Sequence, residues 1–314
     1  MPKLNVQQNN ANVIKALRNA LAIGQIKGLI ASDGADNFSS AGSNRNLLDN
    51  PFFTVRQRGD GPFTGNVYGV DRWRGSNSRT TVTGASGYIT LSTNSSGNGF
   101  LRQILPQTYE GTFTYSVMLR GTGSGVIAFQ DSGGTNIGTA TSYSNVGANW
   151  TLISCTVTTS GTPIGGVVVR VDTSTSVDIL CAKMEKGGVS TLANDVPPDY
   201  GTELLKCMRY FMRLNYTGVA EPIGYGYAYA ASQARILIPT PVPMRAAPTI
   251  SATATANLRI NSNGTYLTPS GFAVTGTAFP NGIAVHFGIS GATSGALALL
   301  FSYDAMYIDF SADL

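Results

Sequence analysis

The sequence predicts a mainly β protein with an N-terminal helix, a jelly-roll β-sandwich and a smaller C-terminal β-domain. Short segments of alternating or β-branched apolar residues recur without helices between them, which is typical of a sandwich. Turn residues bound these segments, and the chain contains 37 glycines. Only 12% of its 314 residues are charged, about half the usual share. Low charge with ordinary hydrophobicity favours a folded chain whose surface is neutral or buried against other chains.

The first predicted element is a helix over residues 9–22. Its apolar residues repeat at helical spacing, and Gly24 can end the helix. A single amphipathic helix has no core of its own, so it must pack on its own chain, on a partner or on copies of itself. Residues 31–45 are small and polar and predict a linker. We therefore expect residues 1–45 to serve in attachment or oligomerisation.

The second predicted unit is the jelly roll, over residues 46–195. Its predicted strands are 88–91, 113–119, 126–129, 150–157 and 167–171. Cys155 and Cys181 lie inside these apolar patterns, where cysteine usually acts as a small hydrophobic residue. Together with Cys207 they make an odd, widely spaced set, which argues against a disulfide framework or a zinc site.

A proline-rich turn and a short helix over residues 196–208 follow the jelly roll. Asp199 or Thr202 can cap this helix. Residues 209–314 are predicted to form the C-terminal β-domain, with a proline-rich connection near 239–248. The predicted strands of this domain are 225–230, 235–239, 258–260, 271–274, 283–287 and 306–310.

Two sets of motifs bracket the jelly-roll region. The first comprises Asn46-Leu47-Leu48, Gln57-Arg58-Gly59 and Asp71-Arg72-Trp73. The second comprises Glu185-Lys186-Gly187, Asp199-Tyr200-Gly201 and Cys207-Met208-Arg209-Tyr210-Phe211. In this order they resemble the fibre and appendage proteins of tailed bacteriophages, of the tail-fibre or head-fibre type. In that family the pattern opens and closes a jelly roll like that of carbohydrate-binding modules.

The resemblance extends over residues 46–314. Family members often continue into a smaller β-domain with a Met-Arg-x-x-Pro element and end close to Phe-Ser-Ala-Asp-Leu, and both features occur here, at 244–248 and 310–314. Met208 departs from the family, which usually has Gln at that place. The resemblance implies a structural protein of the virion, made in the host cytoplasm and frequently trimeric. It does not distinguish attachment to a tail from attachment to a head or neck.

Charged residues of the motifs are predicted to have a structural role. Arg58, Asp71, Arg72 and Glu185 can form a buried ion-pair network that ties the two ends of the jelly roll together, because arginine pairs with carboxylates in bidentate fashion. The alternative is that Arg72 contacts a ligand. Trp73 and Trp150 are predicted to anchor the core. The structural motif as a whole comprises Arg58, Asp71, Arg72, Trp73, Glu185, Tyr200 and Arg209.

Sugar binding requires exposed aromatic faces beside hydrogen-bonding groups. Tyr225, Tyr227 and Tyr229 alternate with small residues and therefore share one face of a strand. This row either packs in a core or subunit interface or forms a receptor platform. Other tyrosines that can contact sugar are Tyr68, Tyr88, Tyr143 and Tyr266. Asp49 and Asp178 are candidate oxygen ligands for the structural calcium ion that carbohydrate-module jelly rolls often carry.

Catalysis fits the sequence poorly. His286 is the single histidine, and it lies in an alternating strand with no Ser/His/Asp set around it. Glycosidic cleavage needs two carboxylates at a set separation, and none of the acidic residues shows such pairing. The acidic residues considered are Asp71, Asp131, Asp172, Glu185 and Glu221. We expect no enzymatic activity and no cofactor, with a glycan depolymerase as one alternative.

These observations predict a non-enzymatic virion fibre protein that displays β-domains for adhesion to a host-surface glycan. The other alternative is a capsid- or neck-associated decoration protein without a receptor role. The expected partners are two further copies in a homotrimer, other virion proteins through residues 1–45, and the glycan. The net charge of +4 with scattered basic residues argues against nucleic-acid binding. No stretch reaches the roughly 18–20 apolar residues of a membrane span, and the N-terminus has no signal-peptide core.

Overall fold

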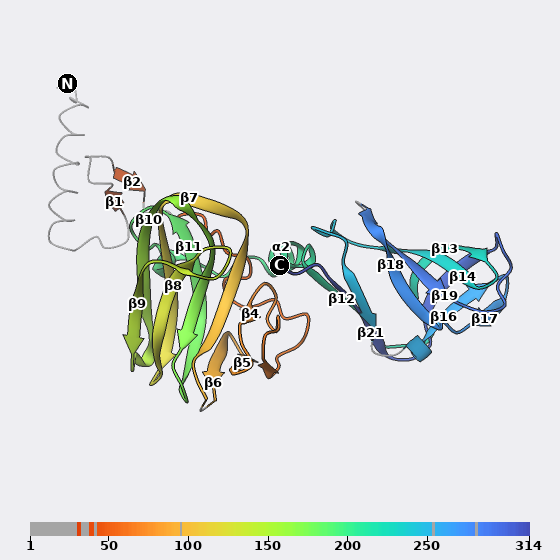
Figure 1. The fold of residues 1–314 in the computed structure, drawn as a ribbon, viewed down its shortest axis with the longest axis horizontal. Helices are drawn as coiled ribbons and strands as arrows, with labels where there is room; N and C mark the ends of the chain where they lie inside the picture. Colours follow the sequence, from red (N-terminus) through yellow and green to blue (C-terminus); the bar gives the residue numbers. More distant parts are fainter. Residues whose placement is uncertain (1–29, 33–37, 41–42, 95, 253–254, 280–281) are drawn as a thin grey trace, which may run out of the picture.

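The computed structural model describes residues 30–32, 38–40, 43–94, 96–252, 255–279 and 282–314. Two β domains lie end to end, and helix α2 (Tyr200–Met208) lies between them (Figure 1). The helix predicted over residues 9–22 lies outside the described residues. Within the predicted linker, β1 (Ile30–Ser32) pairs antiparallel with β2 (Phe38–Ser40). No helix of the described residues is long and apolar enough to cross a membrane.

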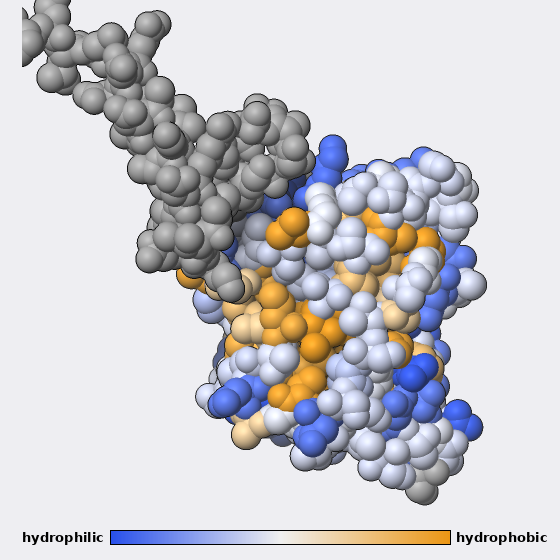
Figure 2. Space-filling view, turned by 90° about the vertical axis from the view of Figure 1, so that its left-hand side faces the viewer, coloured by the Kyte–Doolittle hydropathy of each residue, from blue (hydrophilic) through white to orange (hydrophobic). Residues whose placement is uncertain are grey.

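The first domain is a two-layered sandwich built from one continuous strand order, β3-β5-β6-β11-β7-β10-β8-β9, with β4 paired to β7. Seen from the end away from the C-terminal domain, it shows a band of hydrophobic residues bordered by hydrophilic ones (Figure 2). Its strands are β3 (Phe63–Thr64), β4 (Arg74–Gly75), β5 (Thr80–Ala85), β6 (Tyr88–Thr93), β7 (Gly99–Gly121), β8 (Ser124–Gln130), β9 (Asn136–Ser144), β10 (Gly147–Val171) and β11 (Ser176–Lys186).

Two long strands, β7 and β10, connect the layers. Residues 111–121 of β7 pair with 147–159 of β10 in one layer, and residues 99–104 pair with 166–171 in the other. The register shifts between these halves, where Gly111 has a φ of 113° and Gly161 a φ of 83°, a conformation that glycine adopts without strain. Both segments predicted as strands, 150–157 and 167–171, are confirmed, but they are parts of one strand, because bulges and glycines let β10 bend between the layers.

The jelly-roll core includes Trp73, which is 1% exposed and is one of its largest buried side chains. Its ring lies 5.0 Å from that of Phe53, and its indole N–H donates to the backbone carbonyl of Asn50 at 3.0 Å. Alternate residues of β7 point inward to the same core, and Tyr115, Val117 and Leu119 are fully buried. The first motif thus begins at the half-buried Asn46 and ends in the core at Trp73.

The connection between the domains contains the 3₁₀ turn η1 (Leu192–Asn194) and helix α2. The Asp199 carboxylate accepts a hydrogen bond from the backbone N–H of Thr202 at 2.8 Å, so Asp199 is the helix cap. Glu203 and Cys207 are buried on the opposite side of the helix from solvent. The Glu203 carboxylate accepts from the backbone N–H of Asn50, which anchors the helix to the jelly roll.

The second domain packs a three-stranded sheet, β12-β21-β15, with a seven-stranded sheet, β17-β16-β20-β13-β14-β19-β18. Strand β20 was not predicted from the sequence. The last strand, β21, lies between β12 and β15 and returns the chain to α2 (Figure 1). The elements are β12 (Phe211–Tyr216), β13 (Pro222–Ala230), β14 (Gln233–Pro239), β15 (Thr249–Ala252), η2 (Thr255–Asn257), β16 (Leu258–Ser262), β17 (Thr265–Leu267), β18 (Gly271–Phe279), β19 (Gly282–Gly288), β20 (Leu297–Ser302) and β21 (Met306–Ser311).

Candidate functional site

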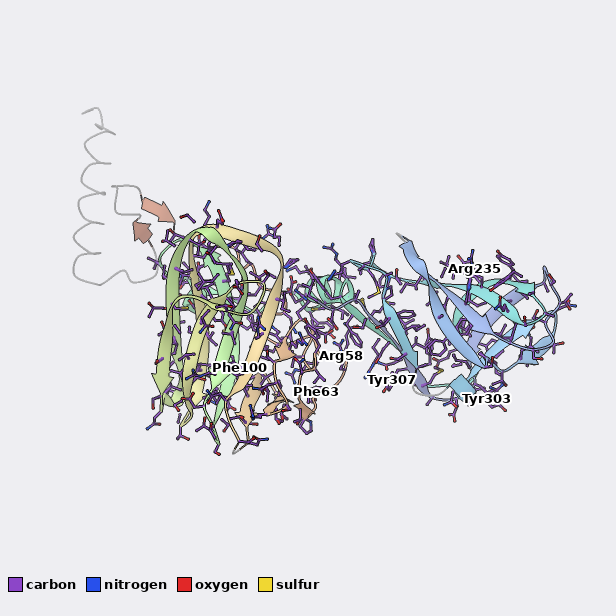
Figure 3. The ribbon with its side chains drawn as sticks, viewed as in Figure 1. Arg58, Phe63, Phe100, Arg235, Tyr303 and Tyr307 are labelled. Atoms are coloured by element: carbon purple, nitrogen blue, oxygen red, sulfur yellow. The ribbon has the colours of Figure 1, made fainter. Side chains whose placement is uncertain are left out.

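Arg58 joins the jelly roll to the C-terminal domain (Figure 3). Its guanidinium donates to the Asp313 carboxylate at 2.5 Å and lies 3.3 Å from the centre of the Phe211 ring. Beside it, the Asp71 carboxylate accepts from the backbone and side-chain N–H groups of Gln57 at 2.8 and 2.7 Å. The Gln57 amide also donates to the backbone carbonyl of Phe211. These contacts fix the two domains to each other.

The predicted ion-pair network of Arg58, Asp71, Arg72 and Glu185 was wrong, because each charge has a different partner. Arg72 is fully buried and donates to the Asp49 carboxylate at 3.0 Å. Glu185 accepts from the backbone N–H and hydroxyl of Thr191 at 2.7 and 2.6 Å. Of the remaining motif residues, Tyr200 is 55% exposed on α2 and Arg209 is exposed after it. The motif closes the jelly roll at several separate points.

The predicted tyrosine row lies on the outer surface of the C-terminal domain. Tyr225, Tyr227 and Tyr229 are 55%, 47% and 36% exposed, whereas Ala228 on the opposite face of β13 is buried. On the neighbouring strand β20, Leu299 pairs with Tyr225 and Leu297 with Tyr227, and these leucines are 44% and 64% exposed. We call these five side chains the tyrosine face. Sequence reasoning missed its leucines, because residues 297–301 are all apolar and show no alternation that would mark one face as exposed.

A polar edge borders the tyrosine face on β14 and β19. Arg235, which pairs with Tyr227 in the sheet, donates through its Nε to Nε2 of His286 at 2.7 Å. His286 therefore carries its proton on Nδ1, which lies 3.4 Å from the hydroxyl of Tyr229. Burial and the adjacent Arg235 lower the pKa of His286, so the imidazole is neutral at pH 7. His286 thus contacts one member of the tyrosine face, Tyr229, and one residue that borders it, Arg235.

Trp150 lies on the outer face of the jelly roll, half-buried, and the prediction that it anchors the core was wrong. The Arg120 guanidinium lies 4.4 Å from the Trp150 ring and 4.6 Å from the Tyr88 ring. Asp178 accepts from Arg120 at 2.9 Å and from Thr90 at 2.8 Å. The next residue, Thr151, pairs with the buried Leu119 of β7, and since side chains alternate along a strand, Trp150 points to the opposite, outer face. Arg120 therefore stacks on rings that a sugar would otherwise contact.

The remaining candidates are distributed over the molecule. The hydroxyl of Tyr68 donates to the backbone carbonyl of Leu314 at 2.5 Å. Tyr143 is buried, and its hydroxyl donates to the backbone carbonyl of Arg170. Tyr266 is 65% exposed. The two calcium candidates, Asp49 and Asp178, are held in separate ion pairs with arginines. The described residues contain no group of three or more His, Cys, Asp or Glu side chains placed to hold a metal ion.

The three cysteines are buried free thiols. Burial raises the pKa of Cys155 and of Cys181 to about 12, and it also raises that of Cys207. The thiols are therefore protonated at neutral pH and poorly suited to nucleophilic chemistry.

No protein-family model and no curated protein matches this chain. Solved structures to which it is similar include the CBM22-1-GH10 modules of a Clostridium thermocellum endo-1,4-β-D-xylanase complexed with xylohexaose, at 15% identity and a TM-score of 0.33. The match covers 50% of this chain and 30% of that one. The enzymatically active domain of bacteriophage CBA120 tailspike protein 4 matches at 14% identity and a TM-score of 0.33, over 45% of this chain and 21% of that one.

A mutant of the family 29 carbohydrate-binding module CBM29-2 is also similar, at 11% identity and a TM-score of 0.31. That match covers 44% of this chain and 96% of the module. Carbohydrate-binding modules and a tailspike domain are thus among the structures similar to this chain, which spans less than a third of the xylanase and tailspike chains. At these identities and TM-scores the matches bear on neither the site nor its ligand.

Proposed function

We propose that the protein is a non-enzymatic virion fibre protein that binds a host-surface glycan through the tyrosine face. The observation that carries this proposal is the exposure of three tyrosine rings in a row on a sheet surface. Ring faces contact the apolar C–H patches of sugars, and the hydroxyls supply hydrogen bonds. Tyrosine has only two side-chain torsions, so a row of tyrosines binds with a small loss of conformational entropy.

The geometry of the tyrosine face supports recognition of an extended chain. The Tyr227 and Tyr229 rings lie 6.4 Å apart at 68° to each other, an edge-to-face contact that holds neighbouring rings of the row in place for a ligand that extends along the strand. Arg235 at the edge adds donors that fix the orientation of the ligand. The tyrosine face itself contains no carboxylate, whereas glycoside hydrolysis uses a pair of them. Binding without cleavage is the function this surface supports.

The location in a virion and the trimeric assembly rest on the ordered sequence motifs and on the low charge of the chain. An exposed apolar face also suits a contact between copies, and Leu297 at 64% exposure favours this second role. In that case the protein would be a decoration protein whose tyrosine face is covered in the trimer. Leu297→Asp would then reduce the mass measured by light scattering to that of a monomer, whereas an adhesion surface would leave the mass unchanged.

A glycan array tests the adhesion role directly. We expect the intact protein to bind a subset of glycans and Tyr227→Ala to lose at least tenfold in affinity for them. Tyr303→Ala is the matched control, because Tyr303 is 53% exposed in the same domain but lies outside the tyrosine face. Equal binding by the Tyr227→Ala variant and the intact protein would refute the proposal, and release of reducing ends would favour the depolymerase.

A further inference from the structure

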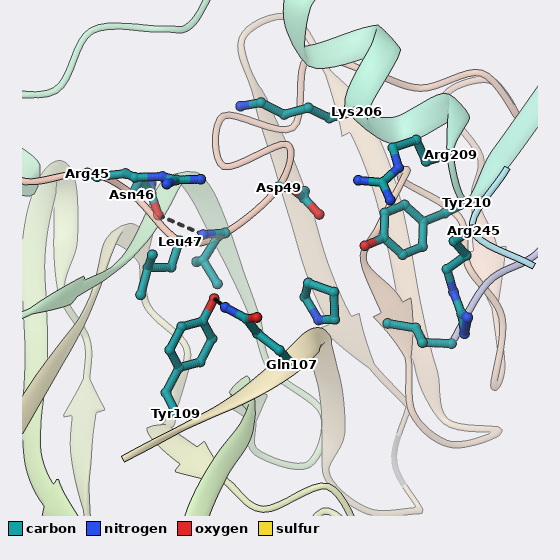
Figure 4. Close-up of a pocket in the computed structure, with 13 residues that line it drawn as sticks. Arg45, Asn46, Leu47, Asp49, Gln107, Tyr109, Lys206, Arg209, Tyr210 and Arg245 are labelled. Carbon is teal, nitrogen blue, oxygen red and sulfur yellow. Dashed lines mark hydrogen bonds between the residues drawn. The ribbon is translucent and has the colours of Figure 1, made fainter. Parts of the chain in front are cut away.

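A pocket of about 580 Å³ lies at the junction between the jelly roll and the C-terminal domain (Figure 4). The entrance segment of the jelly roll, the middle of β7, the end of α2 and the loop before β15 all contribute to its lining. This volume is within the range of small-molecule sites. The pocket is separate from the tyrosine face, with which it shares no residue.

Four cationic side chains and one acidic side chain line this pocket, together with Leu314, the last residue of the sequence. The cations are Arg45, Lys206, Arg209 and Arg245, and the carboxylate is Asp49. Asp49 is already paired with the buried Arg72, and Lys206 with Glu203. Within the described part of the chain, the three arginines of the pocket have no ion-pair partner. Most of the ion pairs in that part of the chain do contain an arginine.

The arginines come from three separate segments, and backbone contacts hold two of them together. The backbone N–H of Arg245 donates to the carbonyl of Arg209 at 2.9 Å, which places these residues side by side. Tyr210 lies between them in Figure 4, and the Arg72 guanidinium lies 3.5 Å from the centre of its ring. Like charges gathered in this way repel one another, and an anion in the pocket relieves that repulsion.

The other groups of the pocket fit a sugar. Gln107 donates to the hydroxyl of Tyr109 at 3.0 Å, and both side chains present polar atoms opposite the arginines (Figure 4). Tyr109, which is half-buried, adds aromatic surface for C–H contacts, whereas the Tyr210 ring is buried beneath the Arg72 guanidinium. Guanidinium groups bind carboxylates through two parallel hydrogen bonds. We infer that this pocket binds a carboxylate-bearing sugar, as a free acid or as a residue of an acidic glycan.

The inference goes beyond the proposed function, because it concerns a different site and a charged ligand. Titration calorimetry of the full chain with sodium glucuronate at low salt tests it, with glucose as the neutral match and inorganic phosphate as the non-sugar anion. We expect glucuronate to bind and glucose not to bind. Raising the salt concentration should weaken glucuronate binding, because the interaction is between charges. Phosphate that binds as tightly as glucuronate would overturn the assignment to a sugar acid.

Variants locate the site. The double substitution Arg209→Gln and Arg245→Gln should weaken glucuronate binding at least tenfold without changing the unfolding temperature, because both side chains are exposed. Arg79→Gln is the control, since it removes an exposed arginine from the turn before β5. Unchanged glucuronate affinity in the double variant would overturn the inference. Loss of glucuronate binding there, with the glycan-array binding of the tyrosine face retained, would separate the two sites.

Discussion

The two β domains differ in what they bury and in what they expose. In the described part of the chain, the jelly roll buries the charged residues Asp71, Arg72, Lys183 and Glu185, whereas the buried polar residues of the C-terminal domain are two serines, Ser262 and Ser302. The exposed aromatic side chains show the opposite distribution. Among the described residues, every exposed aromatic side chain except that of one tyrosine on α2 belongs to the C-terminal domain.

This difference assigns different roles to the two domains. The ammonium group of Lys183 is fully buried and donates to Ser43, Thr191 and Asp195. A buried ammonium group must keep these hydrogen-bond partners, because an unpaired buried charge costs a large free energy. The jelly roll is therefore a rigid support. The C-terminal domain has an apolar core that needs no such pairing, and it leaves aromatic surface available for a ligand.

The largest expected effect is on the stability of the jelly roll. Trp73→Ala removes a fully buried ring and its hydrogen bond to Asn50, so the free energy of unfolding of the jelly roll should fall by about 3–5 kcal/mol. Urea denaturation followed by circular dichroism measures this change. A loss below about 1 kcal/mol would mean that Trp73 does not anchor the core, and the contrast between the domains would weaken.

The next effect is a pH dependence at the junction. Burial raises the pKa of Asp71 from 3.8 to about 6, although bonds from Gln57 and the charge of Arg58 oppose the rise. The folded protein then holds this proton more tightly than the unfolded chain does. The resulting stabilisation is fully present below about pH 4 and is lost as the pH rises through 6, with an upper limit of roughly 3 kcal/mol.

Asp71→Asn should remove this step from a plot of unfolding free energy against pH. Asp60→Asn is the control, because the Asp60 side chain is 70% exposed. A step of the same size in the Asp71→Asn variant would show that another group is responsible.

A smaller effect is expected for the ion pair that joins the domains. Arg58 and Asp313 are partly buried, with side chains 14% and 9% exposed, so a double-mutant cycle with Arg58→Gln and Asp313→Asn should give a coupling of about 1–2 kcal/mol. The pair of Arg56 and Asp60, in which the arginine is equally buried but the carboxylate is 70% exposed, provides the comparison and should give less than about 0.5 kcal/mol. Equal couplings would mean that the ion pair at the junction stabilises the protein no more than the other pair does.

The sequence predicted those features that depend on local pattern. Alternation placed Tyr225, Tyr227 and Tyr229 on one face of a strand, and capping chemistry placed α2 after Asp199. It did not predict the partner of Arg58, because Asp313 lies 255 residues along the chain. Nor did it predict the outward position of Trp150, since an apolar strand pattern looks the same whether or not an arginine covers its aromatic residue.

The smallest expected effect on stability coincides with the largest expected effect on binding. Replacing Tyr225 and Tyr227 together by alanine removes exposed side chains, so the free energy of unfolding should change by no more than about 0.5 kcal/mol per residue. The decisive measurement is the glycan binding of this double variant beside its unfolding curve. We predict that binding is lost while the unfolding curve is retained. Retained binding by the folded double variant would contradict the assignment of the tyrosine face as the adhesion surface.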